Sequence, residues 1–248
     1  ALFPVAPGAQ PGPLHRATGA WLRCLAKEDA FVSGRAVAVT TAGLTESDAS
    51  DVVSAEFAAG PDTVDVWWEG RTRRVLRPTE VPGPDGDGAP VFREGGVYLV
   101  TGGLGGVGLL IARYLAERYR ARLVLTGRRD LDDVLRERLR AVTAAGSEVI
   151  YVTADVARRA DVDRLVVRAK ERFGHVDGVL HCAGELRDGF VRTRSAADVA
   201  AVLAPKVEGT RHLDEALAGE PLDCFVLFSS MSALLGNAGQ SDYCFANA

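Results

Sequence analysis

The second half of the chain alternates short apolar runs with longer stretches of helical periodicity. The apolar runs predict strands over residues 97–101, 122–126, 148–153, 178–181 and 224–229. The stretches between them predict helices over residues 108–120, 131–145, 160–173 and 196–218. Apolar strands that alternate with helices of this length predict a parallel sheet covered on both faces, as in doubly wound α/β folds.

The first 90 residues carry a weaker and more mixed pattern. Residues 4–13 are rich in proline and glycine and predict a linker without regular structure. The segments that follow predict a helix over 14–28, a strand over 36–41 and a helix over 45–58. Thr45 and Asp48 have the spacing of a capping box at the start of that second helix. Two further strands, 64–68 and 72–76, flank Glu69-Gly-Arg71 and predict a hairpin.

A second stretch rich in proline and glycine, residues 82–90, separates the two patterns. We therefore predict a smaller unit with its linkers over residues 1–90 and an α/β domain over residues 91–248. The chain starts at Ala1 without a methionine, so we expect it to be a piece of something longer.

The composition is that of a soluble globular protein, with 47% hydrophobic and 25% charged residues in 248. No apolar run approaches the roughly 18 residues of a membrane helix, and no leader opens the chain. The net charge of −4 favours neither a nucleic-acid face nor a membrane-surface patch. We predict a cytoplasmic protein that binds neither nucleic acid nor membrane.

The cysteine pattern argues against a metal site and against a disulfide framework. The four cysteines, Cys24, Cys182, Cys224 and Cys244, lie far apart, and none forms a Cys-x-x-Cys pair. They are expected to be reduced and buried. Lysine is rare, with only Lys27, Lys170 and Lys206 beside 26 arginines, so a retained lysine suggests a role that arginine fills poorly.

A glycine-rich loop stands directly after the first predicted strand of the α/β domain and directly before a helix. Glycines there let the backbone turn tightly and approach a pyrophosphate, whose charge the helix N-terminus stabilises. The alternative is a tight turn with a structural role only. The loop satisfies both GxGxxG and TGxxxGxG, and its candidate cofactor-binding residues are Thr101, Gly102, Gly103, Leu104, Gly105, Gly106, Val107 and Gly108.

The residues after the next two strands indicate which dinucleotide would bind. An NAD site places an acidic residue after the second strand to hold the ribose 2′-hydroxyl. Arg128 and Arg129 stand there instead, and guanidinium groups suit a 2′-phosphate, so NADPH is favoured over NADH. Two solvated arginines at a helix start are the alternative. Asp155 and Val156 come just after the third predicted strand, where they would hold the adenine or form a surface turn.

Ser230 directly follows the fifth predicted strand, and Tyr243 and Asn247 come after it at intervals of 13 and 4 residues. A tyrosine phenol, with an ordinary pKa near 10, can donate a proton to a carbonyl oxygen as hydride arrives. A nearby cation makes the donation easier, and a serine hydroxyl can hold the same oxygen. The pattern predicts reduction of a carbonyl group.

Together these motifs resemble short-chain dehydrogenase/reductases, and in particular the ketoreductase domain of a modular polyketide synthase. Simple members carry Tyr-x-x-x-Lys, whereas Asn247 stands in the lysine position here. The ketoreductases carry their lysine within Leu-x-Pro-Lys-Val, which Leu203-Ala-Pro-Lys-Val207 matches. Further matching motifs are Gly96-Val-Tyr-Leu-Val-Thr-Gly-Gly103, His181-Cys-Ala-Gly184, Phe228-Ser-Ser230 and Gly239-Gln-Ser-Asp-Tyr243.

The resemblance covers residues 96–248 and implies a Rossmann-type sheet with NADPH as cofactor. It implies that Tyr243 donates the proton and Ser230 orients the ketone. Lys206 would assist the tyrosine and anchor the nicotinamide ribose, and Asn247 would hold a relay water. The implied substrate is a β-ketoacyl chain linked through phosphopantetheine to an acyl carrier protein, beside neighbouring synthase domains. Residues 14–78 resemble, less specifically, part of the family's degenerate α/β structural subdomain.

The resemblance also bears on subtype and product configuration. Asp188, the last residue of Leu186-Arg-Asp188, matches members that make the B-type, D-configured alcohol, although a solvated loop carboxylate is the alternative. A-type members carry tryptophan eight residues before the tyrosine, where this chain has Leu235. The segment Gly236-Asn-Ala-Gly-Gln-Ser-Asp-Tyr243 is most like assembly lines with trans-acting acyltransferases.

Several departures keep other functions open. Gly127 stands where the family often has a serine that binds the 2′-phosphate, and we expect the first half of the structural subdomain to be missing. The catalytic domain is expected to be truncated after Ala248, before its last strands and substrate lid. An inactive ketoreductase kept as a scaffold, or a free-standing reductase of a small ketone, are therefore the alternatives.

Overall fold

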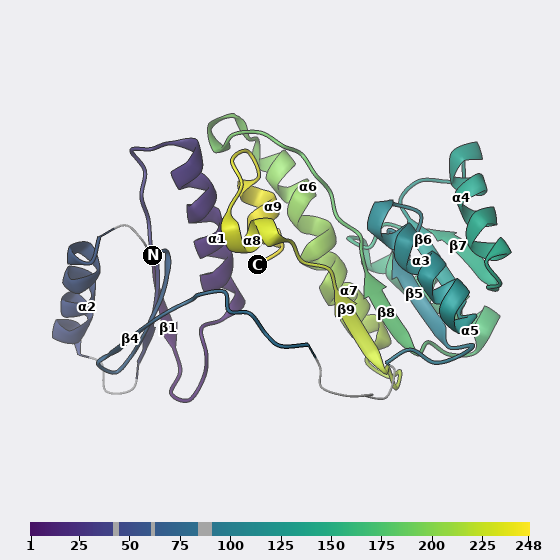
Figure 1. Cartoon of the computed structure of the whole chain (residues 1–248), viewed down its shortest axis with the longest axis horizontal. Helices are drawn as coiled ribbons and strands as arrows, with labels where there is room; N and C mark the ends of the chain where they lie inside the picture. The colour runs from purple at the N-terminus through teal and green to yellow at the C-terminus, as the bar shows by residue number, and fades with distance from the viewer. Residues whose placement is uncertain (42–44, 61–62, 84–90) are drawn as a thin grey trace. The chain divides into compact units, whose positions relative to one another are not determined.

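The computed structural model describes residues 1–41, 45–60, 63–83 and 91–248 (Figure 1). The chain forms two compact units. The first comprises residues 1–83, 186–199 and 229–248, and the second comprises residues 84–185 and 200–228. Two segments of the second half of the chain thus pack with the first unit. The division at residues 90 and 91 remains a prediction.

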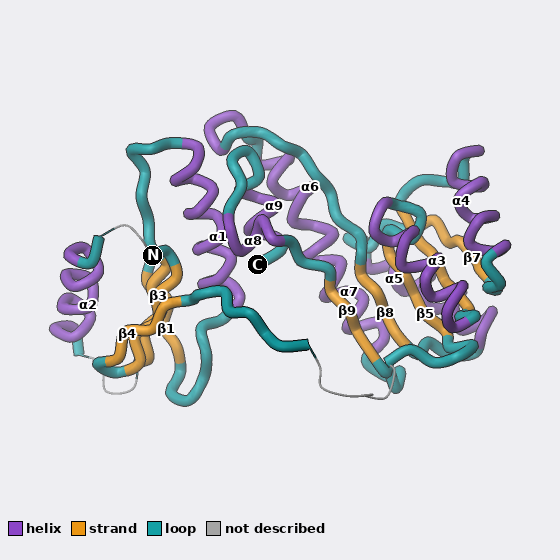
Figure 2. Tube along the Cα trace, viewed as in Figure 1, coloured by secondary structure: helices purple, strands orange, loops and turns teal. Residues whose placement is uncertain are grey.

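The second unit is a five-stranded parallel sheet in the order β7-β6-β5-β8-β9. Figure 2 shows its strands alternating along the chain with helices. The strands are β5 (Val97–Thr101), β6 (Arg122–Gly127), β7 (Val149–Thr153), β8 (Gly178–His181) and β9 (Cys224–Leu227). The helices are α3 (Gly106–Tyr119), α4 (Asp133–Ala144), α5 (Arg159–Phe173) and α7 (Glu208–Leu217), together with the part of α6 (Ala196–Lys206) from residue 200 onward.

Both faces of this sheet are buried, which confirms the predicted Rossmann-type doubly wound fold. Alternate residues of β5 point to opposite faces, since Val97 and Leu99 join one apolar cluster and Tyr98 and Val100 the other. The first cluster includes side chains of α5 and α7, and the second includes side chains of α3 and α4. The chain reverses its direction of winding between β5 and β8, where such folds bind their ligands.

Two boundaries in this unit differ from the sequence prediction. The helix predicted over 196–218 is two helices, because Pro205 lies inside α6 and the helix ends at Lys206. A proline ring clashes with the carbonyl four residues earlier and lacks a donor N–H, so the next helix restarts after Val207. The fifth strand ends at Leu227 rather than residue 229.

The first unit contains a four-stranded sheet in the order β1-β2-β3-β4. Its strands are β1 (Leu2–Val5), β2 (Ala36–Thr40), β3 (Asp65–Glu69) and β4 (Thr72–Val75), and its helices include α1 (Pro13–Glu28) and α2 (Glu46–Ala58). The predicted hairpin is confirmed by the antiparallel pair β3–β4. The capping box of Thr45 and Asp48 is confirmed as well.

The prediction of a linker over residues 4–13 is wrong at its start. Pro4 and Val5 belong to β1, which pairs in parallel with β2. A proline is tolerated there because β1 lies at the edge of the sheet, where one row of backbone groups needs no partner strand. Three short elements were not predicted: the 3-10 helix η1 (Val191–Thr193), α8 (Met231–Leu235) and α9 (Ser241–Ala246).

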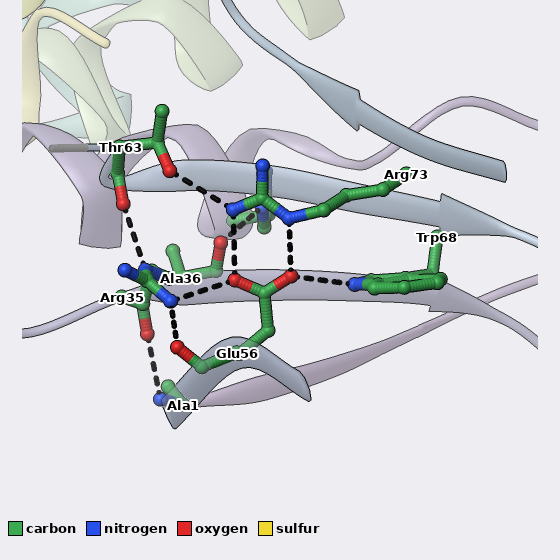
Figure 3. Close-up of polar contacts among 8 residues, drawn as sticks. Ala1, Arg35, Ala36, Glu56, Thr63, Trp68 and Arg73 are labelled. Carbon is green, nitrogen blue, oxygen red and sulfur yellow. Dashed lines mark hydrogen bonds and ion pairs between the residues drawn. The ribbon is translucent and has the colours of Figure 1, made fainter. Parts of the chain in front are cut away.

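A buried carboxylate fastens α2 to the sheet of the first unit (Figure 3). One Glu56 oxygen accepts hydrogen bonds from Trp68 Nε1 and Arg73 Nε, both at 2.7 Å. The other oxygen accepts from Arg73 Nη2 at 2.9 Å and Arg35 Nη1 at 2.8 Å. Burial by itself would raise the pKa of Glu56, but the donors Arg73 and Trp68 and the charge of Arg35 outweigh it and lower that pKa.

We expect Glu56→Gln to destabilise the first unit by about 3 kcal/mol, because two half-buried guanidinium groups lose their buried counterion. The wild-type unit should also lose stability as pH falls from the ordinary carboxyl value through the lowered folded pKa of Glu56. The variant should lack this acid-side contribution. Urea titration followed by tryptophan fluorescence measures it, since all three tryptophans lie in the first unit.

The matched control is Glu69→Gln, which removes an exposed ion pair with Arg74 within the β3–β4 hairpin. Exposed pairs contribute at most about 1 kcal/mol, so the control should change the midpoint little. Equal effects of the two substitutions would contradict the role given to Glu56.

Candidate functional site

A cleft of about 440 Å³ opens in the second unit. Its walls come from the segments that follow four of the parallel strands and from one face of α6. It therefore lies at the carboxyl edge of the sheet, at the switch point between β5 and β8. The lining residues are Gly102, Gly105, Gly106, Val107, Gly108, Thr126, Gly127, Arg128, Ala154, Asp155, Val156, Ala157, Cys182, Ala183, Gly184, Ala201, Ala204 and Pro205.

The glycine loop is held in a shape that only glycine allows. Gly102 has φ of +62°, in the left-handed region. A Cβ on Gly108 would overlap the carbonyl oxygen of Gly102 and come within 2.9 Å of the Gly103 Cα atom. The backbone of Gly108 thus lies against that of Gly102 and Gly103, and this close contact forms a cradle between β5 and α3.

The N-terminus of α3 faces this cradle without a side-chain cap. Gly105 is the capping residue and supplies no side-chain acceptor, and the first turn of the helix carries no acidic residue. Gly105, Gly106, Val107 and Gly108 all line the cleft. The first-turn N–H groups and the positive end of the helix dipole therefore suit a phosphate group, so the residues present fit a dinucleotide.

Not every residue of the predicted loop lines the cleft. Thr101, Gly103 and Leu104 are absent from its walls. Leu104 is buried in the core beside β5 and β6, and its carbonyl accepts a hydrogen bond from Arg138 at 2.8 Å. These three residues belong to the loop but do not face the cleft.

Of the four residues assigned to the 2′-phosphate and the adenine, three line the cleft and Arg129 does not. Arg128 lines the cleft and forms an ion pair with Glu185 at 2.6 Å, a partner that the sequence did not reveal. Arg129 does not line it, and its carbonyl accepts from the Tyr151 hydroxyl at 2.7 Å. Asp155 lines the cleft, and its Oδ1 accepts from Ala157 N at 3.0 Å. Val156 lines it too.

A buried histidine connects the glycine loop to α6. His181 Nε2 lies 2.8 Å from the carbonyl of Pro205, which can only accept, so this nitrogen carries the proton. Nδ1 then accepts from the Thr101 hydroxyl at 2.6 Å, and that hydroxyl accepts from Ala183 N at 3.1 Å. Burial lowers the pKa of His181 to about 4, and the charge of Lys206 adds to this.

We expect His181 to stay neutral through the range in which ordinary histidines titrate, near pH 6.5. Because the unfolded chain takes up a proton at higher pH than the folded one, folding stability should fall as pH drops from 6.5 towards about 4. Imidazole ¹⁵N NMR measures the protonation, with the His181 signals assigned by their loss in His181→Gln. An ordinary titration midpoint at His181 would contradict this hydrogen-bond arrangement.

Lys206 ends α6 and lies beside the cleft wall. Its Nζ donates to the carbonyl of Phe228 at 2.7 Å. A Cβ on Gly184, a lining residue, would lie 3.3 Å from the Lys206 Cε atom. Burial lowers the pKa of this lysine. The sequence-predicted lysine is therefore held in place next to the residues that line the cleft.

The other reactive side chains belong to the first unit. Ser230 caps α8, and its Oγ accepts from Ser232 N at 3.2 Å. Tyr243 lies on α9 and is half-buried. Asn247 Nδ2 donates to the Tyr243 carbonyl at 2.9 Å, and Ser229 Oγ donates to the Asn247 carbonyl at 2.5 Å. The residues before α8 and after α9 are thereby tied together.

The residues assigned to stereocontrol lie near α9 and α8. Both oxygens of Asp188 accept from Gln240 Nε2, at 3.1 and 3.2 Å. Leu235 ends α8 and is exposed. Beside Tyr243, Asp242 forms a buried ion pair with Arg194, which the sequence did not predict.

The structure thus brings the predicted residues together in two groups. The second unit holds the glycine loop, Arg128, Asp155 and Lys206, and the first unit holds Asp188, Ser230, Tyr243 and Asn247. Within the described ranges, no three His, Cys, Asp or Glu side chains are grouped as metal ligands. Of the helices in the described parts of the chain, none has the length and apolar character to cross a bilayer.

Comparison with known proteins gives consistent matches. The family model described as "KR domain" matches residues 96–248. The polyketide synthase PksN of Bacillus subtilis (strain 168) is 35% identical over 227 residues, which are 91% of this chain and 4% of that protein. The chain therefore spans a small fraction of the curated relatives that it matches.

Two solved structures are similar over the whole chain. An N-terminal ketoreductase from the macrolactin assembly line has a TM-score of 0.84 and 35% identity, over 99% of this chain and 49% of that one. A ketoreductase domain from the bacillaene assembly line has a TM-score of 0.83 and 31% identity, over 100% of this chain and 58% of that one. This chain spans about half of each of those structures.

Proposed function

Because this chain belongs to the KR domain family, the ketoreductase domains of polyketide synthases, we propose that it reduces a β-ketoacyl thioester to the β-hydroxyacyl product with NADPH. The substrate would be carried on the phosphopantetheine arm of an acyl carrier protein, beside neighbouring synthase domains. The observation that supports this most is the glycine-lined cleft at the uncapped start of α3, with Lys206 held beside it.

The cofactor would be held by residues that line or flank the cleft. The N–H groups at the start of α3 would bind its pyrophosphate, and Arg128 its 2′-phosphate. Asp155 and Val156 would bind the adenine, and Lys206 the nicotinamide ribose. When bound, the nicotinamide supplies a hydride to C3 of the ketone.

The proton would come from this chain. Tyr243 would donate its phenolic proton to the ketone oxygen as C3 accepts the hydride, so the product is a neutral alcohol. The Ser230 hydroxyl would donate a hydrogen bond to the same oxygen. The positive charge of Lys206 would stabilise the phenolate left behind, and Asn247 would hold the water that returns a proton to it.

The configuration of the alcohol belongs to the proposal as well. Asp188 in the Leu186-Arg-Asp188 triplet, and Leu235 in place of tryptophan, favour the B-type, D-configured alcohol. Similarity to the Bacillus synthase PksN and the bacillaene ketoreductase supports an assembly line of the trans-acyltransferase type.

Two other functions have less support. An inactive scaffold would not need to keep Lys206, Ser230, Tyr243 and Asn247, and all four are present. A free-standing reductase of a small ketone fits poorly with relatives of which this chain matches only about 4%.

The test is NADPH oxidation by the purified protein with a diffusible β-ketoacyl thioester. We expect kcat/KM to be about 100-fold higher with NADPH than with NADH, and Arg128→Ala to remove most of that preference. Chiral analysis should find the D-configured β-hydroxyacyl product. Folded protein that binds NADPH but reduces no β-ketoacyl thioester would favour the scaffold function.

A further inference from the structure

The last turns of α1 run beside the segment that leads from α8 to Tyr243, all within the first unit. Arg23 Nη2 donates to the carbonyl of Ala233 at 2.9 Å, and Lys27 Nζ donates to that of Gly236 at 2.9 Å. Gly236 has φ of +71°, and a Cβ there would lie 2.9 Å from the backbone of Arg23. The segment is therefore in close contact with α1 and hydrogen-bonded to it at both Ala233 and Gly236.

Glu28, the last residue of α1, makes the next contact and reaches a second loop. Its Oε1 accepts from Gly239 N at 2.9 Å, and its Oε2 accepts from Val191 N at 2.7 Å. Gly239 precedes Gln240 in the segment leading to α9, and Val191 follows the loop of Asp188. One half-buried carboxylate thus binds both loops, through charge-assisted hydrogen bonds that are stronger than neutral ones.

The two loops that Glu28 contacts are also joined to each other by hydrogen bonds. Gly189 N donates to the carbonyl of Gly239 at 2.8 Å, and Gln240 donates to Asp188. The position of the Asp188 carboxylate relative to α9 therefore depends on Gly239 and Gln240, and Glu28 binds Gly239 directly.

We propose that Glu28 is a positioning residue, which fixes the Asp188 loop against the Tyr243 segment and thereby determines which face of the ketone is reduced. This inference rests on the proposed function. The two faces of a ketone differ only in the orientation in which the substrate is held. A displacement of about 1 Å in the groups that orient a substrate can cost about 10²-fold in rate.

The experiment compares Glu28→Ala and Glu28→Gln with the control Glu69→Gln, whose carboxylate pairs with Arg74 at the surface. With Glu28→Ala, we expect the minor enantiomer of the alcohol to increase about tenfold and kcat to fall about 10- to 100-fold. Glu28→Gln keeps one carbonyl acceptor and should lie between Ala and wild type. NADPH affinity should stay within about twofold, since the residues that line the cofactor cleft belong to the second unit.

Amide hydrogen exchange supplies a readout that needs no turnover. In Glu28→Ala, we expect peptides that contain Val191 and Gly239 to exchange about tenfold faster, because both amides lose their acceptor. If the Ala variant does not fold, the Gln variant serves for both measurements.

Each possible result either supports or overturns the role proposed for Glu28. Unchanged exchange would overturn the inference, because the loops would then be held without Glu28. Faster exchange with unchanged configuration and kcat would also overturn it, because Glu28 would then have a structural role only. A wild-type protein that binds NADPH and reduces no ketone contradicts the proposed function, and with it the effect on configuration, whereas the exchange result still decides whether Glu28 holds the loops.

Discussion

Replacing Tyr243 with Phe is expected to lower kcat for ketone reduction by about 10³-fold and to leave NADPH affinity unchanged. The substitution keeps the aromatic ring on α9, so the packing of that helix and the Asp242–Arg194 ion pair should survive. It removes the phenolic proton, and the hydroxyl of Ser230 is too weak an acid to replace it. Steady-state NADPH oxidation gives the rate, and a fluorescence titration with NADPH gives the affinity.

The matched control for this prediction is Tyr114→Phe. Tyr114 is an exposed residue of α3, and losing its hydroxyl should change neither rate nor affinity. A Tyr243→Phe protein that keeps more than about a tenth of the wild-type kcat would exclude the tyrosine as the main proton donor.

The second large effect is expected from Gly108→Ala, which should raise the Kd for NADPH at least about 100-fold and lower the stability of the second unit. The new Cβ would overlap the Gly102 carbonyl oxygen and crowd Gly103 Cα. Both neighbours are backbone atoms, so the loop must open to admit the methyl group. An opened loop no longer presents the α3 N-terminus to the pyrophosphate.

Gly219→Ala is the control, because a Cβ at Gly219 has no atom within 4 Å. NADPH titration and thermal unfolding of both variants measure the two effects. Wild-type affinity in a folded Gly108→Ala protein would show that the glycine loop does not bind the cofactor.

The parallel sheet could be predicted because its signal is local and repeated. Each of its strands is an apolar run next to a helical stretch, and β5 is buried on both faces. The edge strand β1 has no such signal. It contains Pro4, a residue that argues against a strand, and its apolar Leu2 is exposed rather than buried. The helices α8 and α9, with five and six residues, are too short to show a helical period.

The same distinction holds for the candidate site. The glycine loop could be placed from sequence because its strand, turn and helix are consecutive residues. Lys206 was found through its motif and through the rarity of lysine in this chain. The contacts of Glu185 with Arg128, of His181 with Thr101 and of Glu28 with two loops join residues far apart in sequence. Single polar residues have no periodicity that would reveal such partners.

The cleft of the second unit is proposed to bind NADPH for hydride transfer to C3 of a β-ketoacyl thioester. NADPH that carries deuterium at both C4 positions tests it most directly, with the product analysed by mass spectrometry and NMR. We expect the wild-type protein to place one deuterium atom at C3 of the β-hydroxyacyl product, and Tyr243→Phe to form deuterated product only at the level of its residual activity. An alcohol without deuterium at C3, or label elsewhere in the product, would contradict it.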